Sequence, residues 1–576
     1  MNARRILILL SVAAILGIAS CTRIPSSERS QESHRRIGDF VLRDMHGQTQ
    51  SLQDFAQSKF LIVVFLGIEC PLAKRCVPLF NDLPKSFASH VAVIGIDANA
   101  QDSPSRLQAF ARETSAAFPI LCDPDQVVAD RFGAQRTPEA FVLDEMRRIR
   151  FQGRVGDGGD LREALGDLFA GRAVRNPAVP AVGCRIGRRP ATAKPSDLAF
   201  GTHIRPILEA RCGECHRPGE IAPFGLLEWK EVAAWSATIR EVVEDGRMPP
   251  WHADAKAGHF RNDARLTSEE KARLMRWIDD GCPEGPPAIP SAPRFIDGWR
   301  IPSPSLILAM SEKPFPVPAT GALDYQCFVV DPGFREDKFV QSAEVRPGNR
   351  AVVHHALISL IAPGADEKSP NNLGAMLNYA PGMQATQLPP GWAIRIPAGS
   401  KFLFQMHYTP NGKAHVDRTS LGLVWVDAKS VKHEVRGGAI ANPSIAIPAF
   451  AADHTETAEQ VFREDIRLLS VSPHMHLRGK AFRIEAAMPD GERKILLQVP
   501  RYDFHWQLRY EFADPIRLPA GSRLICVATY DNSAGNRNNP NPSQRVTWGD
   551  QTSDEMLIGF FSYVEDQKER THTMMP

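Results

Sequence analysis

The sequence predicts a multidomain protein in which an α/β domain is followed by a small all-α domain and by two all-β sandwich domains. Apolar strand-like runs alternate with helical segments over residues 36–172, which is typical of a βαβ arrangement. Helical segments between proline-rich stretches occupy residues 199–288. Strand-like runs fill residues 300–576, where the turn Pro-Ala-Gly-Ser occurs at 397–400 and again at 519–522. The length of 576 residues suits three or four such domains.

The chain begins with a segment, residues 1–21, that resembles a bacterial lipoprotein signal peptide. A basic start is followed by the apolar run 6–18 and by small residues directly before Cys21. The resemblance implies lipidation of Cys21 and a location outside the cytoplasm, in the periplasm or cell envelope, with a lipid anchor in a membrane. Ordinary signal cleavage, with Cys21 incidental, is the alternative. The net charge of +2 gives no electrostatic reason to expect nucleic acid as a partner.

A cysteine follows the first buried strand of the α/β domain. The apolar run Phe60–Leu66 leads through a short turn to Cys70, and Thr137-Pro138 precedes a later strand. This pattern, over residues 36–172, resembles the thioredoxin-like redoxin or peroxiredoxin superfamily. The resemblance implies a cis-proline at Pro138 beside a reactive thiol. A cysteine at the N-terminus of a helix has its thiolate stabilised by the helix dipole, which is the physical basis of that chemistry.

Two departures from that superfamily leave the role of the domain open. Cys70 and Cys76 are separated by five residues instead of the two of a Cys-x-x-Cys pair, and Gly67 replaces the threonine expected before a peroxidatic cysteine. We expect Cys70 and Cys76 to be the catalytic residues of the domain, either as a dithiol or as carriers that pass copper to the C-terminal half. A retained fold without thiol turnover is the alternative.

Residues 173–198 are rich in proline and are expected to form a linker. They contain Cys184. The spacing of cysteines does not decide whether Cys184 pairs with Cys282, or Cys327 with Cys526, because connectivity cannot be read from spacing.

The most specific short motif of the sequence lies in the predicted all-α domain. Cys212-Gly213-Glu214-Cys215-His216 fits the Cys-x-x-Cys-His signature of c-type haem attachment. In such a site Cys212 and Cys215 bond covalently to the haem and His216 is the proximal ligand of the iron. A zinc site or a chance pair is the alternative. Residues 199–288 resemble a small class I-like cytochrome c, which implies haem c as a cofactor.

Met248 is the expected sixth ligand of that iron, because a thioether opposite an imidazole stabilises Fe(II). His252 and His259 are the alternatives. A closing helix is expected from about Leu266, with a cap at Thr267 or Ser268.

A His-x-His triplet stands out in the C-terminal half. His474 and His476 are alternate residues of a predicted strand, so that both imidazoles are expected on one face and can bind one metal ion. Met556 follows later in the chain. Imidazole with one thioether is a ligand set that suits copper, since the soft sulfur favours Cu(I) while imidazole accepts both oxidation states. Solvated histidines and a core methionine are the alternative.

An earlier set of histidines consists of the neighbours His354 and His355 and of His407. Two neighbouring residues of an ideal strand point to opposite faces, so His354 and His355 need a bulge or rotated rings to share one ion. Spacing alone does not assign that pair to a metal.

The order of these histidine and methionine motifs over residues 300–576 resembles the type II copper monooxygenases of the peptidylglycine and dopamine hydroxylating family. The resemblance implies two sandwiches, here 300–445 and 446–576, that face each other across a solvent-filled gap and hold one copper ion each. His354, His355 and His407 would hold the electron-transfer copper. His474, His476 and Met556 would hold the copper that binds oxygen and substrate.

These patterns together predict a copper-dependent monooxygenase that hydroxylates a C–H bond of a small-molecule substrate with O2. Electrons from an external donor would reach two copper ions through haem c. Three alternatives remain: an electron-transfer or copper-handling protein without oxygenase activity, a thiol-dependent peroxidase or oxidoreductase acting through Cys70, and a structural or binding protein without metal.

Overall fold

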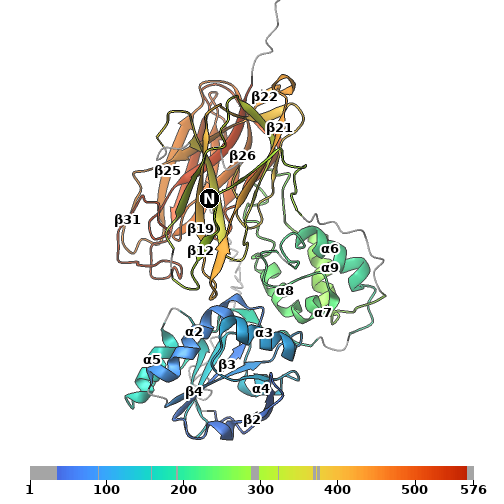
Figure 1. Ribbon diagram of the computed structural model, residues 1–576, viewed down its shortest axis with the longest axis vertical. Helices are drawn as coiled ribbons and strands as arrows, with labels where there is room; N and C mark the ends of the chain where they lie inside the picture. The colour runs from blue at the N-terminus through green and yellow to red at the C-terminus, as the bar shows by residue number, and fades with distance from the viewer. Residues whose placement is uncertain are drawn as a thin grey trace, which may run out of the picture.

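The structure is a computed structural model, in which a β-rich C-terminal half, an α/β domain and a small helical domain can be distinguished (Figure 1). No helix in the described part of the chain is long and apolar enough to cross a membrane. The signal-like segment and Cys21 lie outside the described residues. The structure describes residues 35–87, 90–156, 159–189, 193–218, 220–286, 298–321, 323–366, 371–372 and 377–566.

The α/β domain is built on one mixed sheet. Its central strand β3 (Phe60–Leu66) is buried along its whole length, since seven consecutive apolar residues are covered on both faces. β4 lies parallel to β3 and β5 parallel to β4, while β7 and β8 are antiparallel. In sheet order the strands are β2 (Thr49–Ser51), β1 (Val41–Asp44), β5 (Ile120–Cys122), β4 (Val91–Asp97), β3, β7 (Glu139–Leu143), β8 (Ile149–Arg154) and β9 (Ala178–Val179).

Helices cover both faces of this sheet. α2 (Pro71–Ser86), α3 (Pro104–Thr114) and α5 (Asp160–Phe169) contribute to the apolar cluster on one face. α4 (Val127–Phe132) and the 3-10 turn η1 (Leu52–Phe55) contribute to the cluster on the other face. The predicted βαβ arrangement is therefore confirmed.

The segment expected to be a free linker, 173–198, is partly a component of this domain. β9 pairs with β8, and β10 (Cys184–Arg185) pairs with the short strand β6 (Arg136–Thr137). The prediction of a linker was wrong for these residues, because two-residue strands among prolines leave no periodic signal in the sequence.

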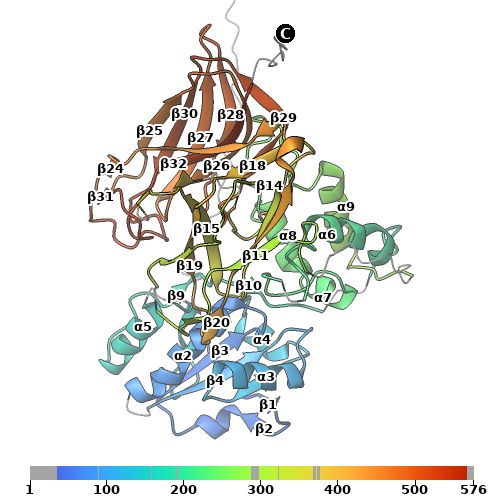
Figure 2. The ribbon, with the colours of Figure 1, turned by 45° about the horizontal axis from the view of Figure 1, so that its top comes forward.

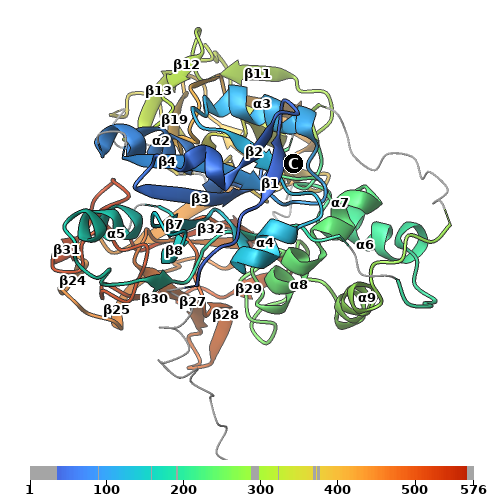
Figure 3. The same ribbon diagram turned by 90° about the horizontal axis from the view of Figure 1, so that it is seen from below.

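The helical domain packs around Trp235 and Trp277, whose side chains are fully buried. The capping box predicted at the start of its last helix is confirmed, since Thr267 accepts from Glu270 N–H and Glu270 accepts from Thr267 N–H. Seen from below, the domain lies to one side of the α/β domain (Figure 3). Its helices are η2 (Phe200–Ile204), α6 (Arg205–Arg211), α7 (Trp229–Ala234), α8 (Ser236–Glu244) and α9 (Ser268–Asp279).

The first sandwich encloses one apolar core between two main sheets. One sheet has the order β11 (Leu306–Ala309), β21 (Ser420–Val426), β14 (Lys338–Arg346), β18 (Trp392–Ile396), β22 (His433–Glu434), with β17 (Thr386–Gln387) also paired to β14. The other has the order β13 (Gln326–Val330), β19 (Lys401–Tyr408), β15 (Val353–Ile361), β16 (Asn371–Asn372). A smaller sheet pairs β12 (Phe315–Val317) with β20 (His415–Asp417), and a 3-10 turn η3 (Ala428–Ser430) follows β21.

The second sandwich has two four-stranded sheets, which fan out at one end of the molecule (Figure 2). Their orders are β23 (Arg436–Ala441), β32 (Ile558–Glu565), β26 (Ile466–His474), β29 (Tyr510–Leu518), and β25 (His454–Val461), β30 (Arg523–Tyr530), β27 (Gly479–Ala487), β28 (Arg493–Val499). β24 (Ala446–Ile447) pairs with β31 (Val546–Thr547). The boundary expected between residues 445 and 446 is too late, because β23 already pairs with β32 of the second sandwich.

The repeated Pro-Ala-Gly-Ser segments form equivalent turns in the two sandwiches. In 397–400 and 519–522 the serine N–H donates to the proline carbonyl at 3.2 and 3.0 Å, and the glycine has a φ of +74° and +88°. Each turn leads directly into a strand of its sandwich, β19 in the first and β30 in the second. A positive φ favours glycine, so the repeated motif has a backbone cause in both places.

Candidate functional site

The thiol of Cys70 lies at the N-terminus of α2, where the chain leaves the central strand β3. Cys70 is the N-cap residue of that helix and is 0% exposed. Its Sγ lies 2.9 Å from the carbonyl oxygen of Thr137. The peptide bond between Thr137 and Pro138 is cis, as the sequence predicted. The expected placement of a cis-proline beside the thiol is confirmed.

A second cysteine, Cys184, lies against Cys70. In the pairing of β10 with β6, Cys184 is directly opposite Thr137, whose carbonyl contacts Cys70. A hydrogen bond from the Cys184 side chain, with further bonds from backbone N–H groups of Cys184 and Ala73, lowers the pKa of Cys70 to about 6. The same hydrogen bond raises the pKa of Cys184. At neutral pH the pair is therefore one thiolate and one thiol.

Close backbone approaches hold this arrangement. A Cβ on Gly183 would lie 2.1 Å from the Thr137 carbonyl oxygen, so β10 can reach β6 only with a glycine at that position. A Cβ on Gly67 would lie 3.0 Å from Thr137 Oγ1 and 2.9 Å from Asn99 Nδ2. The space that a threonine would use at position 67 is thus already filled by Thr137 and Asn99.

Cys76 does not form the expected dithiol with Cys70. Cys70 is the N-cap of α2 and Cys76 lies six positions further along the same helix, which places their Cα atoms about 9 Å apart along the axis. A disulfide needs Cα atoms within about 7 Å. The prediction of Cys70 and Cys76 as partner thiols was wrong for this geometric reason.

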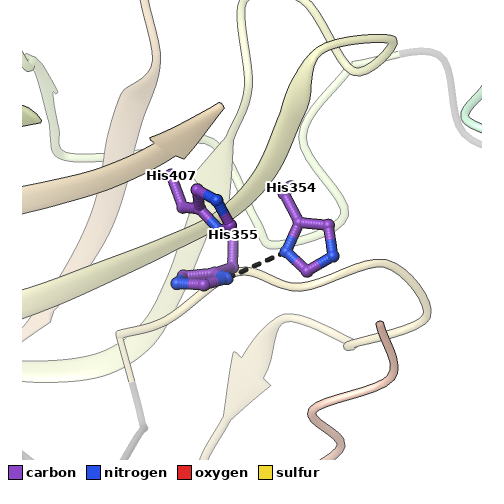
Figure 4. A group of neighbouring side chains, drawn as sticks. All are labelled: His354, His355 and His407. Atoms are coloured by element: carbon purple, nitrogen blue, oxygen red, sulfur yellow. Dashed lines mark hydrogen bonds between the residues drawn. The ribbon is translucent and has the colours of Figure 1, made fainter. Parts of the chain in front are cut away.

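The three histidines of the first sandwich converge at the edge of one sheet. His355 on β15 and His407 on β19 are directly opposite in the strand pairing. The register shifts between Val353 and His355, which makes His354 the extra residue of a β-bulge. The bulge turns His354 to the same side as His355, as Figure 4 shows, and their Nδ1 atoms are 3.0 Å apart. The predicted need for a bulge is confirmed.

The side chains of this cluster have the chemistry of metal ligands. One ring nitrogen from each of His354, His355 and His407 lies within 4.8 Å of the others. His355 Nε2 and His407 Nδ1 are buried and have no hydrogen-bond partner among the described residues. Burial lowers the pKa of His354 to about 3 and that of His407 to about 4, and it also lowers the pKa of His355. Neutral imidazoles with unpaired nitrogens suit a bound metal ion.

The second histidine pair is formed where β26 ends. His474 and His476 are 4% and 1% exposed, and their ring centroids are 5.2 Å apart. His474 Nδ1 is 2.7 Å from Gln507 Oε1, and His476 Nδ1 is 3.2 Å from the carbonyl oxygen of Asp554. These bonds use Nδ1 and leave Nε2 of both rings for a metal ion.

Met556 lies two residues before β32, which begins at Ile558. Ile558 is opposite His474 in the pairing of β32 with β26, so Met556 lies in the segment that leads into this strand. The neighbouring Glu555 is fully buried and accepts from the backbone N–H groups of His476 and Arg478 at 2.8 and 2.6 Å. Burial raises the pKa of Glu555 to about 7. Met556 as a ligand stays a prediction.

A loop of the second sandwich connects the two histidine sets. The ring of Phe504 stacks on His354 at 5.2 Å and 16°, and it lies 6.0 Å from His476. His505 Nδ1 is 3.1 Å from His354 Nε2. A cavity of about 20 Å³, lined by His355 and His474 among others, lies between the sandwiches. Phe504 thus lies in ring contact with both sets, in the region where the resemblance implies a solvent-filled gap, and that gap stays a prediction.

The Cys-x-x-Cys-His motif follows α6 in the helical domain. Cys212 and Cys215 are free thiols, and His216 Nδ1 is 3.1 Å from the carbonyl oxygen of Phe224. This bond leaves Nε2 of His216 for a haem iron, and burial lowers the pKa of His216, which keeps the ring neutral. The residues present thus fit a covalently attached haem.

Met248 follows α8, and its N–H donates to the Val242 carbonyl at 2.9 Å. Pro249 and Pro250, directly after it, line the same cavity of about 310 Å³ as Cys215. Neither Met248 nor His216 lines this cavity, so Met248 as a ligand of the haem iron stays a prediction. His252 Nδ1 lies 2.9 Å from the Arg501 carbonyl oxygen of the second sandwich.

Comparison with known proteins concerns the N-terminal part of the chain. Residues 34–152 match the AhpC/TSA family, and this segment contains Cys70 and the cis-proline. The N-terminal domain is a thioredoxin-like redoxin domain.

Relatives of the redoxin domain carry thiol-based names. The chain is 26% identical over 146 residues to thiol-disulfide oxidoreductase ResA of Bacillus cereus, which is 25% of this chain and 83% of that protein. It is 23% identical over 105 residues to thiol-disulfide oxidoreductase YkuV of Bacillus subtilis, 18% of this chain and 71% of that protein. A solved structure of a putative thiol:disulfide interchange protein DsbE from Chlorobium tepidum is 21% identical, covers 24% of this chain and 96% of its own, and has a TM-score of 0.22.

The redoxin domain meets the helical domain beside Cys70. Trp235 of the helical domain donates its Nε1–H to Oε2 of Glu69 at 3.0 Å, and Arg106 pairs with Oε1 of the same carboxylate. Trp235 also stacks on Phe224 at 4.3 Å, and Phe224 lies 5.0 Å from the ring of His216. The thiol site and the Cys-x-x-Cys-His motif are thus joined by a short run of packed side chains.

Sequence reasoning missed three residues of these sites. Cys184 lay in the expected linker, and its proximity to Cys70 has no local signal. Phe504 and His505 belong to a loop between strands, and only the packing of one sandwich on the other brings them to His354. The sequence offered one signal for these two residues, the histidine directly after Phe504, in a half of the chain where other histidines were already expected to bind a metal ion.

Proposed function

We propose that this protein is an oxidoreductase whose redoxin domain performs thiol–disulfide exchange at Cys70. The observation that carries the proposal is the position of Cys70 at the start of α2, beside a cis-proline and in a hydrogen bond with a second thiol. The curated relatives of this domain are named thiol-disulfide oxidoreductases, which supports the same chemistry.

The chain itself supplies what this reaction needs. The thiolate, not the thiol, is the nucleophile, and a pKa of about 6 keeps Cys70 mostly ionised at neutral pH. The Ala73 N–H at the start of α2 and the Cys184 side chain hold the negative charge on sulfur. A thiolate of this kind exchanges with a disulfide through a mixed disulfide.

Turnover of a reduced full-length chain with a protein disulfide tests this proposal. Cys70→Ser is expected to lower the exchange rate by at least about 100-fold, because a serine hydroxyl is not ionised at neutral pH. Cys327→Ser is the matched control, since Cys327 is an exposed thiol on the first sandwich. Full activity of Cys70→Ser, or turnover of a hydroperoxide without turnover of a disulfide, would contradict the proposal.

A second candidate function, in the C-terminal half, is copper-dependent oxygenation. It is favoured by the buried His355 Nε2 and His407 Nδ1, which have no partner among the described residues and suit a metal ion. In this proposal His354, His355 and His407 hold one copper ion, and a second set holds another. That second set is His474, His476 and Met556. Bound copper would supply one-electron transfer and oxygen activation.

The residues of the chain define what such a site could do. The Gln507 and Asp554 contacts fix the rings of His474 and His476 with Nε2 free. Phe504 lies in ring contact with His354 of one set and His476 of the other. The small cavity between the sandwiches has room for about one molecule the size of water, so a larger substrate would have to approach from outside it.

The helical domain would supply electrons in this proposal. Cys212 and Cys215 would hold haem c through thioether bonds, and His216 and Met248 would be ligands of its iron, which would supply one-electron transfer. The partners would be a small-molecule substrate, O2 and an external electron donor. Lipid attachment at Cys21 would hold the chain to a membrane outside the cytoplasm, where haem c is attached.

Metal analysis with copper electron paramagnetic resonance tests this second function. About two copper ions and one haem per chain, with one copper signal lost in His474→Ala and altered in Met556→Ala, would support it. Haem without stoichiometric copper after copper-replete expression would contradict it and leave thiol exchange as the activity of the chain.

A further inference from the structure

We propose that Cys184 is the second redox thiol of the redoxin domain and forms a reversible disulfide with Cys70. This inference rests on the proposed thiol–disulfide exchange and names the partner thiol of that site. It assigns a function to a residue outside the segment, 34–152, that matches the AhpC/TSA family.

The short pairing of β10 with β6 brings the two cysteines together at Thr137. β10 lies antiparallel to β6, with Cys184 opposite Thr137 and Arg185 opposite Arg136. Cys70 Sγ contacts the carbonyl oxygen of Thr137 at 2.9 Å, so both cysteines meet at that residue. Cys184 packs against the apolar clusters of both the redoxin domain and the helical domain. Its place is therefore fixed from two sides.

The redoxin domain offers Cys70 no other suitable partner among its described cysteines. Ala73 stands where a Cys-x-x-Cys pair would have its second cysteine, and it is fully buried in the core. Cys76 is too far along α2, as shown above. Cys122 lies on β5, two strands away from the β3 end of the site, and burial raises its pKa to about 11. Cys184 therefore takes the role of second thiol, which Ala73 cannot fill.

The exchange step can be written with its electrons and protons balanced. In the reduced chain the Cys70 thiolate attacks an external disulfide, forms a mixed disulfide with one of its sulfur atoms and releases the other as a thiolate. The Cys184 sulfur then attacks the Cys70 sulfur of the mixed disulfide. The second external sulfur leaves and takes the proton of the Cys184 thiol. The Cys70–Cys184 pair is oxidised by two electrons to a disulfide, and one external disulfide is reduced to two thiols.

The disulfide would lie where the redoxin domain contacts the helical domain. Arg185, next to Cys184, donates its N–H to Thr238 Oγ1 at 3.3 Å, and its Nε pairs with Glu241 at 2.6 Å. Both partners lie on α8 of the helical domain, and Arg136 of β6 pairs with the same Glu241. Oxidation of the pair would therefore link β10 to the start of α2 beside these contacts with α8.

The test is peptide mapping of the purified full chain after equilibration in thiol–disulfide buffers and alkylation of free thiols. The oxidised wild-type chain is expected to give a peptide that links Cys70 to Cys184, and the reduced chain is expected to lose it. Cys184→Ser and Cys184→Ala should abolish the link, lower exchange turnover by at least about tenfold and leave Cys70 open to alkylation. Cys76→Ser should keep the link.

A Cys70–Cys76 link, a Cys184–Cys282 link, or a Cys70 that stays free in the oxidised wild-type chain would overturn the inference. The same experiment separates it from the proposed function. If the Cys70–Cys184 link forms but Cys70→Ser keeps full exchange activity, thiol exchange at Cys70 fails while the pairing stands. If Cys70→Ser is inactive but Cys184→Ser keeps full turnover without any link, the pairing fails alone.

Discussion

The thiol pair of the redoxin domain and the three-histidine cluster of the first sandwich differ in whether their polar atoms find a partner within the chain. Both contain buried side chains with lowered pKa values. For Cys70 the main cause is a hydrogen bond from Cys184, whereas for His354 and His407 the main cause is burial itself. The thiol site thus has its partner within the chain. The histidine cluster has unpaired nitrogens, which points to a ligand from outside the chain.

The two sites are also assembled differently. The thiol site is held by backbone, through the start of α2, a cis-proline and a two-residue strand pairing. The histidine cluster joins a bulge on β15 to β19 and receives Phe504 and His505 from the other sandwich. A change in the packing of the sandwiches is therefore expected to alter the histidine site and to leave the thiol site intact.

The largest effect is expected from His355→Ala, which should lose copper binding at the three-histidine cluster and so test whether that cluster needs a ligand from outside the chain. His355 is 2% exposed, directly opposite His407, and has an unpaired Nε2. Removing a ligand should weaken copper binding at this cluster by more than about 100-fold, since loss of an outer-shell partner alone costs 10–100-fold. Isothermal titration calorimetry with Cu(II) measures this loss of affinity.

The matched control for His355→Ala is His415→Ala. His415 lies in the same sandwich but bonds to Asn349 and Asn411. The His415→Ala variant should bind copper as the wild type does, and both variants should keep thiol-exchange activity. Equal copper affinity of His355→Ala and wild type would show that the unpaired nitrogens serve another purpose.

A smaller effect is expected from His505→Ala. His505 lies 3.1 Å from His354 and belongs to the second sandwich, so it fixes the ring of a proposed ligand across the domain boundary. Its loss should weaken copper binding at the first cluster by about 10-fold and shift the copper resonance signal. His454→Ala, in the same sandwich but bonded to Glu456, should leave the signal unchanged. An unaltered signal in His505→Ala would remove His505 from the site.

The smallest effect concerns the contact between the redoxin and helical domains. Trp235→Phe removes the donor to Glu69 and keeps a ring to stack on Phe224. One lost hydrogen bond to a carboxylate should lower the free energy of unfolding of this pair of domains by about 1.5 kcal/mol. Urea unfolding followed by circular dichroism measures it. A free energy equal to that of the wild type would mean that the domains do not rely on this contact.

The sequence was a good guide where a local pattern has a backbone cause. The buried strand before Cys70, the cis-proline at Pro138 and the cap at Thr267 all follow from short motifs, and the structure confirms them. The bulge at His354 followed from geometry, because neighbouring strand residues cannot share an ion without it.

What the sequence could not predict depends on contacts between distant segments. Cys184 reaches Cys70 because Gly183 allows β10 to lie on β6, and nothing near Cys184 in the sequence records that pairing. His505 is a similar case, since its partner His354 lies in another sandwich. Helix geometry, not composition, excluded Cys76 as the partner of Cys70.

The most direct test of the account is a pH titration of the Cys70 thiolate, followed by its ultraviolet absorbance as the difference between wild type and Cys70→Ser. The expected midpoint is near pH 6, shifted in Cys184→Ala toward the ordinary value of 9.0. Because the folded-state pKa is lowered, this group stabilises the fold fully above pH 9.0, and that contribution is lost as the pH falls through about 6. Exchange activity should therefore rise through about pH 6 and stay level above it. A midpoint near 9.0 in the wild-type chain would contradict the claim that Cys184 and the start of α2 make Cys70 a redox thiol.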